Sequence, residues 1–174
     1  TMEDAMMLGR LYDRGEKIII KLYMEAQTMP DRWSKNIISE LVGSKFPDEV
    51  IVIGGHIDSW DVGQGVHDDA GGCIAAWEAL RLIKKLGLKP KRTIRCVLWT
   101  NEENGSRGNQ AYRDMVREHI DNQILAIESD AGVFAPKGFG FTGSYQARAM
   151  VSDIHELLEP IGAQNLSNGG RAVD

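Results

Sequence analysis

The feature that most restricts how this chain can fold is the uninterrupted β-branched run VIVI at residues 50–53. Such a run favours a strand buried on both faces, since a strand with one face in water would alternate apolar and polar residues. A helical pattern of apolar residues follows at residues 69–86, and a second buried-strand pattern, TIRCVLWT, at residues 93–100. Strands that alternate with helices predict an α/β layer fold with a largely parallel central sheet.

The same reading extends to the rest of the chain. Helices are predicted at residues 1–14, 69–86, 106–120 and 146–158. Strands are predicted at residues 18–26, 36–42, 50–53, 93–100, 123–127 and 138–142. Gly87 is predicted to close the helix at 69–86 in a left-handed conformation. A length of 174 residues suits one domain or a large piece of one.

Composition limits the classes of function. The chain has 25 acidic and 20 basic side chains and a net charge of −5, which argues against a nucleic-acid partner because phosphate binding needs a basic face. No apolar run approaches the roughly 20 residues that span a bilayer, so we expect no membrane segment. The two cysteines, Cys73 and Cys96, lie among apolar neighbours and are predicted to be small buried side chains.

A histidine and several acids follow three of the predicted strands directly. They are His56 and Asp58 after the first, Glu102 and Glu103 after the second, and Asp130 after the third, with Asp68 and Asp69 at the start of the intervening helix. In open α/β sheets, sites form outside the carboxyl ends of the strands, so we expect these groups to converge. His56 and Asp58 project to the same side, which would let the carboxylate hold the imidazole in one tautomer.

Histidine with several carboxylates and no usable thiolate suits zinc, manganese or cobalt, often as a pair of ions bridged by one carboxylate. Each group alone has a simpler interpretation. A histidine after a strand can be a hydrogen-bonding loop residue, Asp-Asp a helix cap, and Glu-Glu a solvated surface. Their joint placement at three successive strand ends favours a metal site.

Two other classes of function remain open at this stage. Residues 138–143 (GFGFTG) are a literal G-x-G-x-x-G, which would indicate a dinucleotide-binding domain, although they lie within a strand-like alternation. The third class is a non-catalytic interaction module that retains the fold. Zinc content and cofactor absorbance of the purified protein would separate the three.

The run GGHIDSWDVGQG at residues 54–65, with the Asp68-Asp69 pair after it, resembles the co-catalytic dizinc exopeptidases. LWTNEE at residues 98–103 and ESD at residues 128–130 continue the similarity, which spans essentially the whole chain. It implies a zinc-exopeptidase, phosphorylase/hydrolase-like fold: a mixed, largely parallel sheet sandwiched by helices. It also implies that residues 1–174 are a single domain, incomplete at both ends, from a catalytic domain whose protease-associated domain and C-terminal part are absent.

The resemblance implies four metal ligands and two catalytic residues. The ligands of the two zinc ions are His56, Asp68, Glu103 and Asp130, with Asp68 bridging both ions. The catalytic residues are Glu102, the general base, and Asp58, which orients His56. A cis peptide bond between Asp68 and Asp69 is implied as well. One further histidine ligand belongs to a later motif that the sequence does not reach, so impaired activity is expected of this chain by itself.

The implied function is that of a zinc-dependent carboxypeptidase or dipeptidase acting on unblocked dipeptides or short peptides. A two-metal-activated water attacks the peptide bond, and the general base takes the water's proton. The resemblance further implies a small peptide as the binding partner, a homodimer, and secretion or lysosomal residence. No nucleic-acid or membrane partner is expected.

Overall fold

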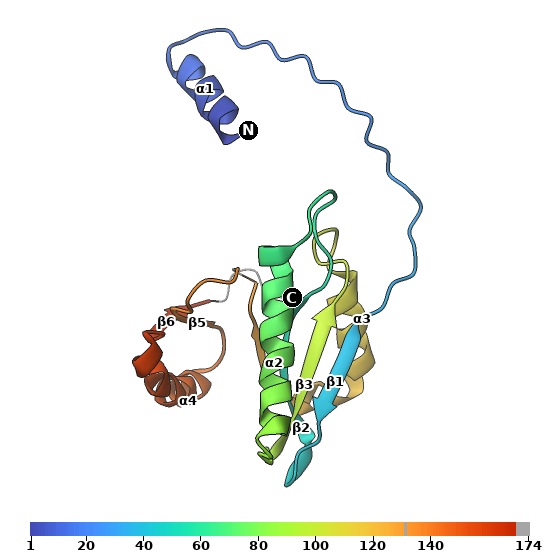
Figure 1. The fold of residues 1–174 in the computed structure, drawn as a ribbon, viewed down its shortest axis with the longest axis vertical. Helices are drawn as coiled ribbons and strands as arrows, with labels where there is room; N and C mark the ends of the chain where they lie inside the picture. The colour runs from blue at the N-terminus through green and yellow to red at the C-terminus, as the bar shows by residue number, and fades with distance from the viewer. Residues whose placement is uncertain (131, 170–174) are drawn as a thin grey trace. The chain divides into compact units, whose positions relative to one another are not determined.

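The computed structural model describes residues 1–130 and 132–169, and the chain divides into two compact units, Thr1–Trp33 and Ser34–Asp174. The elements of the first unit and of the second are shown in Figure 1. In chain order they are α1 (Met2–Asp13), β1 (Ile37–Leu41), β2 (Phe46–His56), the irregular turn η1 (Val66–Ala70), α2 (Gly71–Lys85), β3 (Arg92–Trp99), α3 (Arg107–Val116), η2 (Arg117–Asn122), β4 (Gln123–Glu128), β5 (Gly138–Phe141), α4 (Tyr145–His155), η3 (Glu156–Ile161) and β6 (Asn165–Asn168).

The first unit contains the predicted N-terminal helix. Thr1 caps α1, because its hydroxyl accepts the N–H of Asp4 while the Asp4 carboxylate accepts from Thr1 in return. The strand predicted at residues 18–26 is wrong, since the backbone there is irregular. An apolar segment forms a strand only beside another strand, and within the described residues none pairs with this segment. Its large apolar side chains, including Ile19 and Leu22, are accordingly exposed.

The second unit is built on a four-stranded sheet with the order β1-β3-β2-β4. β2 is parallel to both β3 and β4, and β1 is antiparallel to β3. The predicted α/β fold with a mixed, largely parallel sheet is therefore confirmed. Gly87, just beyond α2, has φ +67°, the left-handed conformation expected of a residue that ends a helix.

Alternate residues of the central strands face two separate helices. Val97 and Trp99 of β3 join a core cluster with Tyr112 and Val116 of α3. Cys96, the residue before Val97, belongs instead to a cluster with Ala76 and Leu80 of α2, and Leu98 packs against the same cluster. Helices thus cover both faces of the sheet, with α2 in the foreground of Figure 1. This explains why residues 50–53 and 96–99 are apolar without interruption.

The C-terminal part of the described chain forms a small second sheet in which β5 and β6 are parallel. β6 has no counterpart among the predicted strands. The G-x-G-x-x-G begins within β5, where Gly138 and Gly140 are paired with Asn165 and Ser167. In a dinucleotide fingerprint these glycines would form the turn after a strand, so the placement does not support that alternative. Among the described helices, none has the length and apolar composition to cross a membrane.

We expect Val97→Ala to lower the free energy of unfolding by roughly 2 kcal/mol, because Val97 is 0% exposed at the centre of the sheet. Ile38→Ala is the control, since Ile38 lies on the edge strand β1 and is 42% exposed. It should cost less than about 1 kcal/mol although it removes more atoms. Chemical denaturation of the two variants checks this, and a larger loss for Ile38→Ala would contradict the described core.

Candidate metal centre

The predicted site residues meet at the carboxyl edge of the parallel strands. β2 lies between β3 and β4, so its last residue, His56, lies between the segments that follow those two strands. In the register, His56 is opposite Trp99 of β3, and Gly54 is opposite Glu128 of β4. The acids that follow Trp99 and Glu128 are thereby brought to either side of the imidazole.

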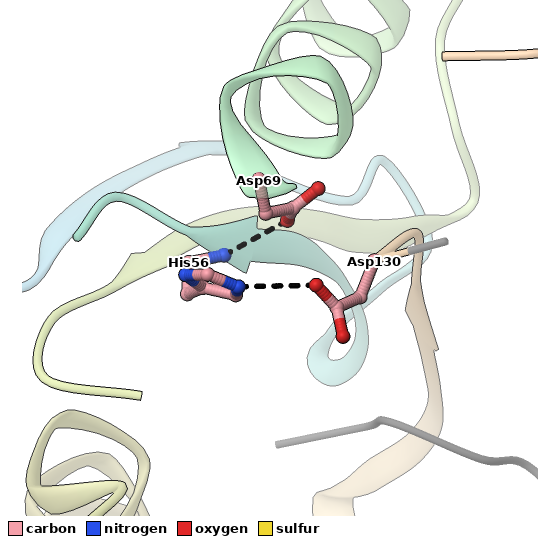
Figure 2. Close-up of side chains that lie close together, drawn as sticks. All are labelled: His56, Asp69 and Asp130. Atoms are coloured by element: carbon pink, nitrogen blue, oxygen red, sulfur yellow. Dashed lines mark hydrogen bonds and ion pairs between the residues drawn. The ribbon is translucent and has the colours of Figure 1, made fainter. Parts of the chain in front are cut away.

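His56 is held firmly and is only 1% exposed. Its Nδ1–H donates to the backbone carbonyl of Asp58 at 3.0 Å, and a carbonyl oxygen can only accept, so the proton of the neutral ring lies on Nδ1. Nε2 then points at two carboxylate oxygens, Asp68 Oδ1 at 2.9 Å and Asp130 Oδ1 at 3.0 Å. Figure 2 shows the contact with Asp130.

Asp68 reaches the imidazole from η1, the irregular turn before α2. Its backbone angles are non-helical, and the peptide bond between Asp68 and Asp69 is cis, as the resemblance implies. The Asp68 side chain is 59% exposed, whereas that of Asp130 is 14% exposed. The two oxygens that face Nε2 therefore come from one solvated and one largely buried carboxylate.

Glu102 and Glu103 lie on a tight turn after β3. The turn begins at Asn101, whose φ is +65°, and the N–H of Ser106 donates to the Asn101 carbonyl at 2.7 Å. Oε2 of Glu102 lies 3.9 Å from Nε2 of His56. Oε1 of Glu103 accepts the backbone N–H of Trp60 at 3.2 Å. Both carboxylates thus lie at the rim of the cluster.

The Asp58 carboxylate makes contacts that the sequence pattern did not indicate. Its Oδ1 lies 3.8 Å from Nδ1 of His56, which is beyond hydrogen-bond distance, and the Asp58 carbonyl binds the ring instead. The carboxylate accepts the backbone N–H of Glu102 at 2.9 Å and that of Glu103 at 3.3 Å. Asp58 therefore joins the loop after β2 to the turn that carries the two glutamates.

Asp69 is a buried residue that sequence analysis placed among the converging acids but to which it gave no role. Its group with His56 and Asp130 is compact, with one ligand atom from each within 4.8 Å of the others. However, its two oxygens accept backbone N–H groups of His56 and Gly72, each at 3.0 Å. The position of the Asp-Asp pair at the start of a helix could have indicated this role, because an acid there commonly accepts N–H groups of the first turn. Asp68 faces the imidazole, whereas Asp69 binds the first turn of α2.

The other side chains with ligand chemistry lie outside the described clusters. His67 is stacked on Phe134, with ring centroids 5.4 Å apart. Cys73 and Cys96 are buried, as predicted. Burial raises the pKa of the Cys73 thiol to about 12, so it stays protonated and is a poor metal ligand at neutral pH.

The electrostatics of the cluster favour a positive charge at its centre. Burial opposes a charged imidazole, but the Asp58 carbonyl and the charges of Asp130 and Asp69 outweigh it and raise the pKa of His56 to about 9. Burial raises the pKa of Asp69 to about 6, and burial also raises the pKa of Asp130. Burial and then the charge of Asp68 raise the pKa of Glu103.

The donor set fits a borderline divalent cation. With the Nδ1 proton fixed, the Nε2 lone pair faces oxygens of Asp68 and Asp130, and three acceptors so close repel one another unless a proton or a metal ion lies between them. Imidazole with carboxylates is a ligand set that zinc accepts. Ligand atoms of His56, Asp68 and Glu103 also lie within 4.8 Å of one another.

Comparison with known proteins identifies the family of this chain. Residues 36–171 match the model described as Peptidase family M28. The motifs most narrowly resemble carboxypeptidase Q, and the similarity is confirmed: carboxypeptidase Q of Xenopus laevis and that of Homo sapiens are each 49% identical to the chain over 174 residues. That is 100% of this chain and 37% of each relative. The crystal structure of a peptidase M28 precursor from Shewanella amazonensis SB2B is 35% identical, with a TM-score of 0.69 over 77% of this chain and 30% of that one.

We expect the apparent affinity for zinc to rise with pH up to about 9. Below this pKa the metal-free imidazole of His56 carries a proton, which it must lose to bind a metal ion. Each unit of pH below it should then weaken zinc binding about tenfold. Calorimetric titration with zinc in buffers of different ionisation enthalpy measures both affinity and released protons. His119→Gln, a histidine on η2, should leave the profile unchanged. A flat profile without proton release would contradict the described cluster.

Proposed function

Because this chain belongs to peptidase family M28, we propose that residues 1–174 are part of the catalytic domain of a zinc-dependent exopeptidase. The observation that carries the proposal is the convergence of His56 Nε2 with the carboxylates of Asp68 and Asp130 at one edge of a parallel sheet. Glutamates 102 and 103 lie beside this cluster on the turn after β3.

We propose two zinc sites that share one ligand. His56 and Asp130 would hold one ion and Glu103 the other, with Asp68 bridging both. The positions of the side chains support this division. Asp130 lies on the β4 side of the imidazole, Glu103 on the β3 side, and the exposed Asp68 faces Nε2 from η1.

Glu102 is the proposed general base. Its carboxylate lies 3.9 Å from Nε2, farther than the 2.9 Å and 3.0 Å of Asp68 and Asp130, so it is next to the ligands without a hydrogen bond to Nε2. Its backbone N–H is held by Asp58, which fixes the start of the turn. From this place Glu102 can take a proton from the attacking water and deliver it to the leaving amine.

When bound, the zinc pair supplies the Lewis acidity that polarises the scissile carbonyl and acidifies the attacking water. The protein's own contribution is to keep the reacting groups in place. Asp58 holds the N–H groups of Glu102 and Glu103, and its carbonyl keeps the His56 ring in the Nδ1–H tautomer. In this proposal Asp58 orients His56 through its backbone and the glutamate turn through its side chain.

The name carboxypeptidase Q, borne by relatives of 47–49% identity, supports an exopeptidase. Its proposed substrates are unblocked dipeptides or short peptides, as the resemblance implies. We further propose that the whole protein is a homodimer and is secreted or lysosomal, as the resemblance implies. A peptidase-like interaction module without activity is the alternative. It would bind zinc as tightly but would hydrolyse no dipeptide, so zinc content measured beside dipeptide hydrolysis separates the two.

In the whole protein, Glu102→Gln should keep both zinc ions but lose roughly 10²–10⁴-fold in kcat for dipeptide hydrolysis, because a carboxamide cannot take up the water's proton. Glu103→Gln should instead lower the zinc content, since an amide oxygen is a weaker ligand than a carboxylate. Metal analysis and steady-state kinetics on the same preparations check both.

The control for this pair is Glu118→Gln, the same change at an exposed position on η2, which should alter neither quantity. Zinc loss in Glu102→Gln with full zinc in Glu103→Gln would exchange the two roles. Unchanged kinetics in both variants would remove the two glutamates from the mechanism.

A further inference from the structure

Asp69 is a buried carboxylate for which the proposed mechanism has no use. The residue is only 1% exposed, yet its hydrogen bonds within the described chain come from backbone N–H groups and not from a cationic side chain. Instead Oδ2 accepts the backbone N–H of His56 at 3.0 Å, and Oδ1 accepts that of Gly72 at 3.0 Å. Figure 2 shows the first of these bonds as a dashed line above the ring's contact with Asp130.

The backbone closes tightly around this carboxylate. A Cβ atom at position 55 would lie 2.3 Å from Asp69 Oδ2, and one at position 72 would lie 2.4 Å from Oδ1 and 1.7 Å from the carbonyl oxygen of Ser129. Only glycine fits at either position, so Gly55 and Gly72 let β2, α2 and the segment after β4 approach one another at Asp69. A longer acid would not fit in the same space.

The backbone of His56 is therefore held at both of its polar groups. Asp69 binds its N–H, and the Cys73 thiol donates to its carbonyl at 3.0 Å. Both partners come from the chain that immediately follows Asp68. The separation between the imidazole on β2 and the Asp68 carboxylate on η1 is thus fixed through Asp69.

We propose that Asp69 is a positioning residue of the metal centre, which sets the His56–Asp68 distance by binding the N–H groups of His56 and Gly72 with one carboxylate. The proposal rests on the proposed function, in which His56 and Asp68 are ligands. Two donors at 3.0 Å need two acceptor oxygens, and only an ionised carboxylate of this length supplies both. An asparagine would turn its NH₂ group toward one of the two N–H groups.

The test compares Asp69→Asn with Asp48→Asn in the whole protein. Asp48 is an exposed acid at the far end of β2, so its variant makes the same change of charge away from the site. We expect Asp69→Asn to bind zinc about 10–100-fold more weakly, the usual loss when a group that orients a metal ligand is removed. The visible absorption spectrum of the cobalt-substituted protein should change as well, whereas Asp48→Asn should match the wild type in both.

A merely structural role would lower the stability of the metal-free protein and leave the zinc affinity and cobalt spectrum of the folded fraction as in the wild type, which would overturn the proposal. If Asp69→Asn does not fold, Asp69→Ala replaces it with the same expected and contrary results, since alanine sets no NH₂ against a donor. Failure of the proposed function is distinct, because it is measured on the wild type alone, which would then bind no zinc or would bind zinc and hydrolyse no dipeptide.

Discussion

Parallel pairing of β2 with β3 on one edge and β4 on the other is the constraint from which the site follows. Parallel neighbours need crossover connections, so the chain must leave each strand at the same end of the sheet. The residues that leave there have no partner in the ladder and can turn toward one another. His56 and Asp130 are brought to 3.0 Å in this way although they are 74 residues apart in sequence.

Within the site, the acids divide into two kinds by what their oxygens face. Asp58 and Asp69 accept backbone N–H groups, and these contacts join segments of the chain. Asp68 and Asp130 each direct a carboxylate oxygen at the imidazole. The first kind builds the frame of the site and the second supplies its charge. This division explains how so many carboxylates can lie together without all of them competing for one cation.

The sequence predicts well which strands are buried and which acids converge, and it predicts poorly which groups those acids bind. The apolar run at residues 50–53 and the largely apolar segment 93–100 predicted the buried strands, because a strand covered on both faces needs apolar residues on both. Strand ends then predicted which acids converge. Periodicity gives the face of a side chain but not its hydrogen-bond partner, so it missed that Asp58 binds the glutamate turn and that Asp69 binds His56 and Gly72. The irregular segment at residues 18–26 was mispredicted because a strand depends on a neighbour that local pattern does not reveal.

The three contacts of His56 have a thermodynamic consequence. Its backbone N–H, its carbonyl and its Nδ1 each have a partner, so the rotamer and orientation of the ring are settled when the chain folds. The conformational entropy of the His56 side chain is therefore lost when the chain folds and not when a metal ion binds. Asp68, at 59% exposure, still has its side-chain freedom to lose. Metal binding would then order carboxylates around an imidazole ring that is already in place.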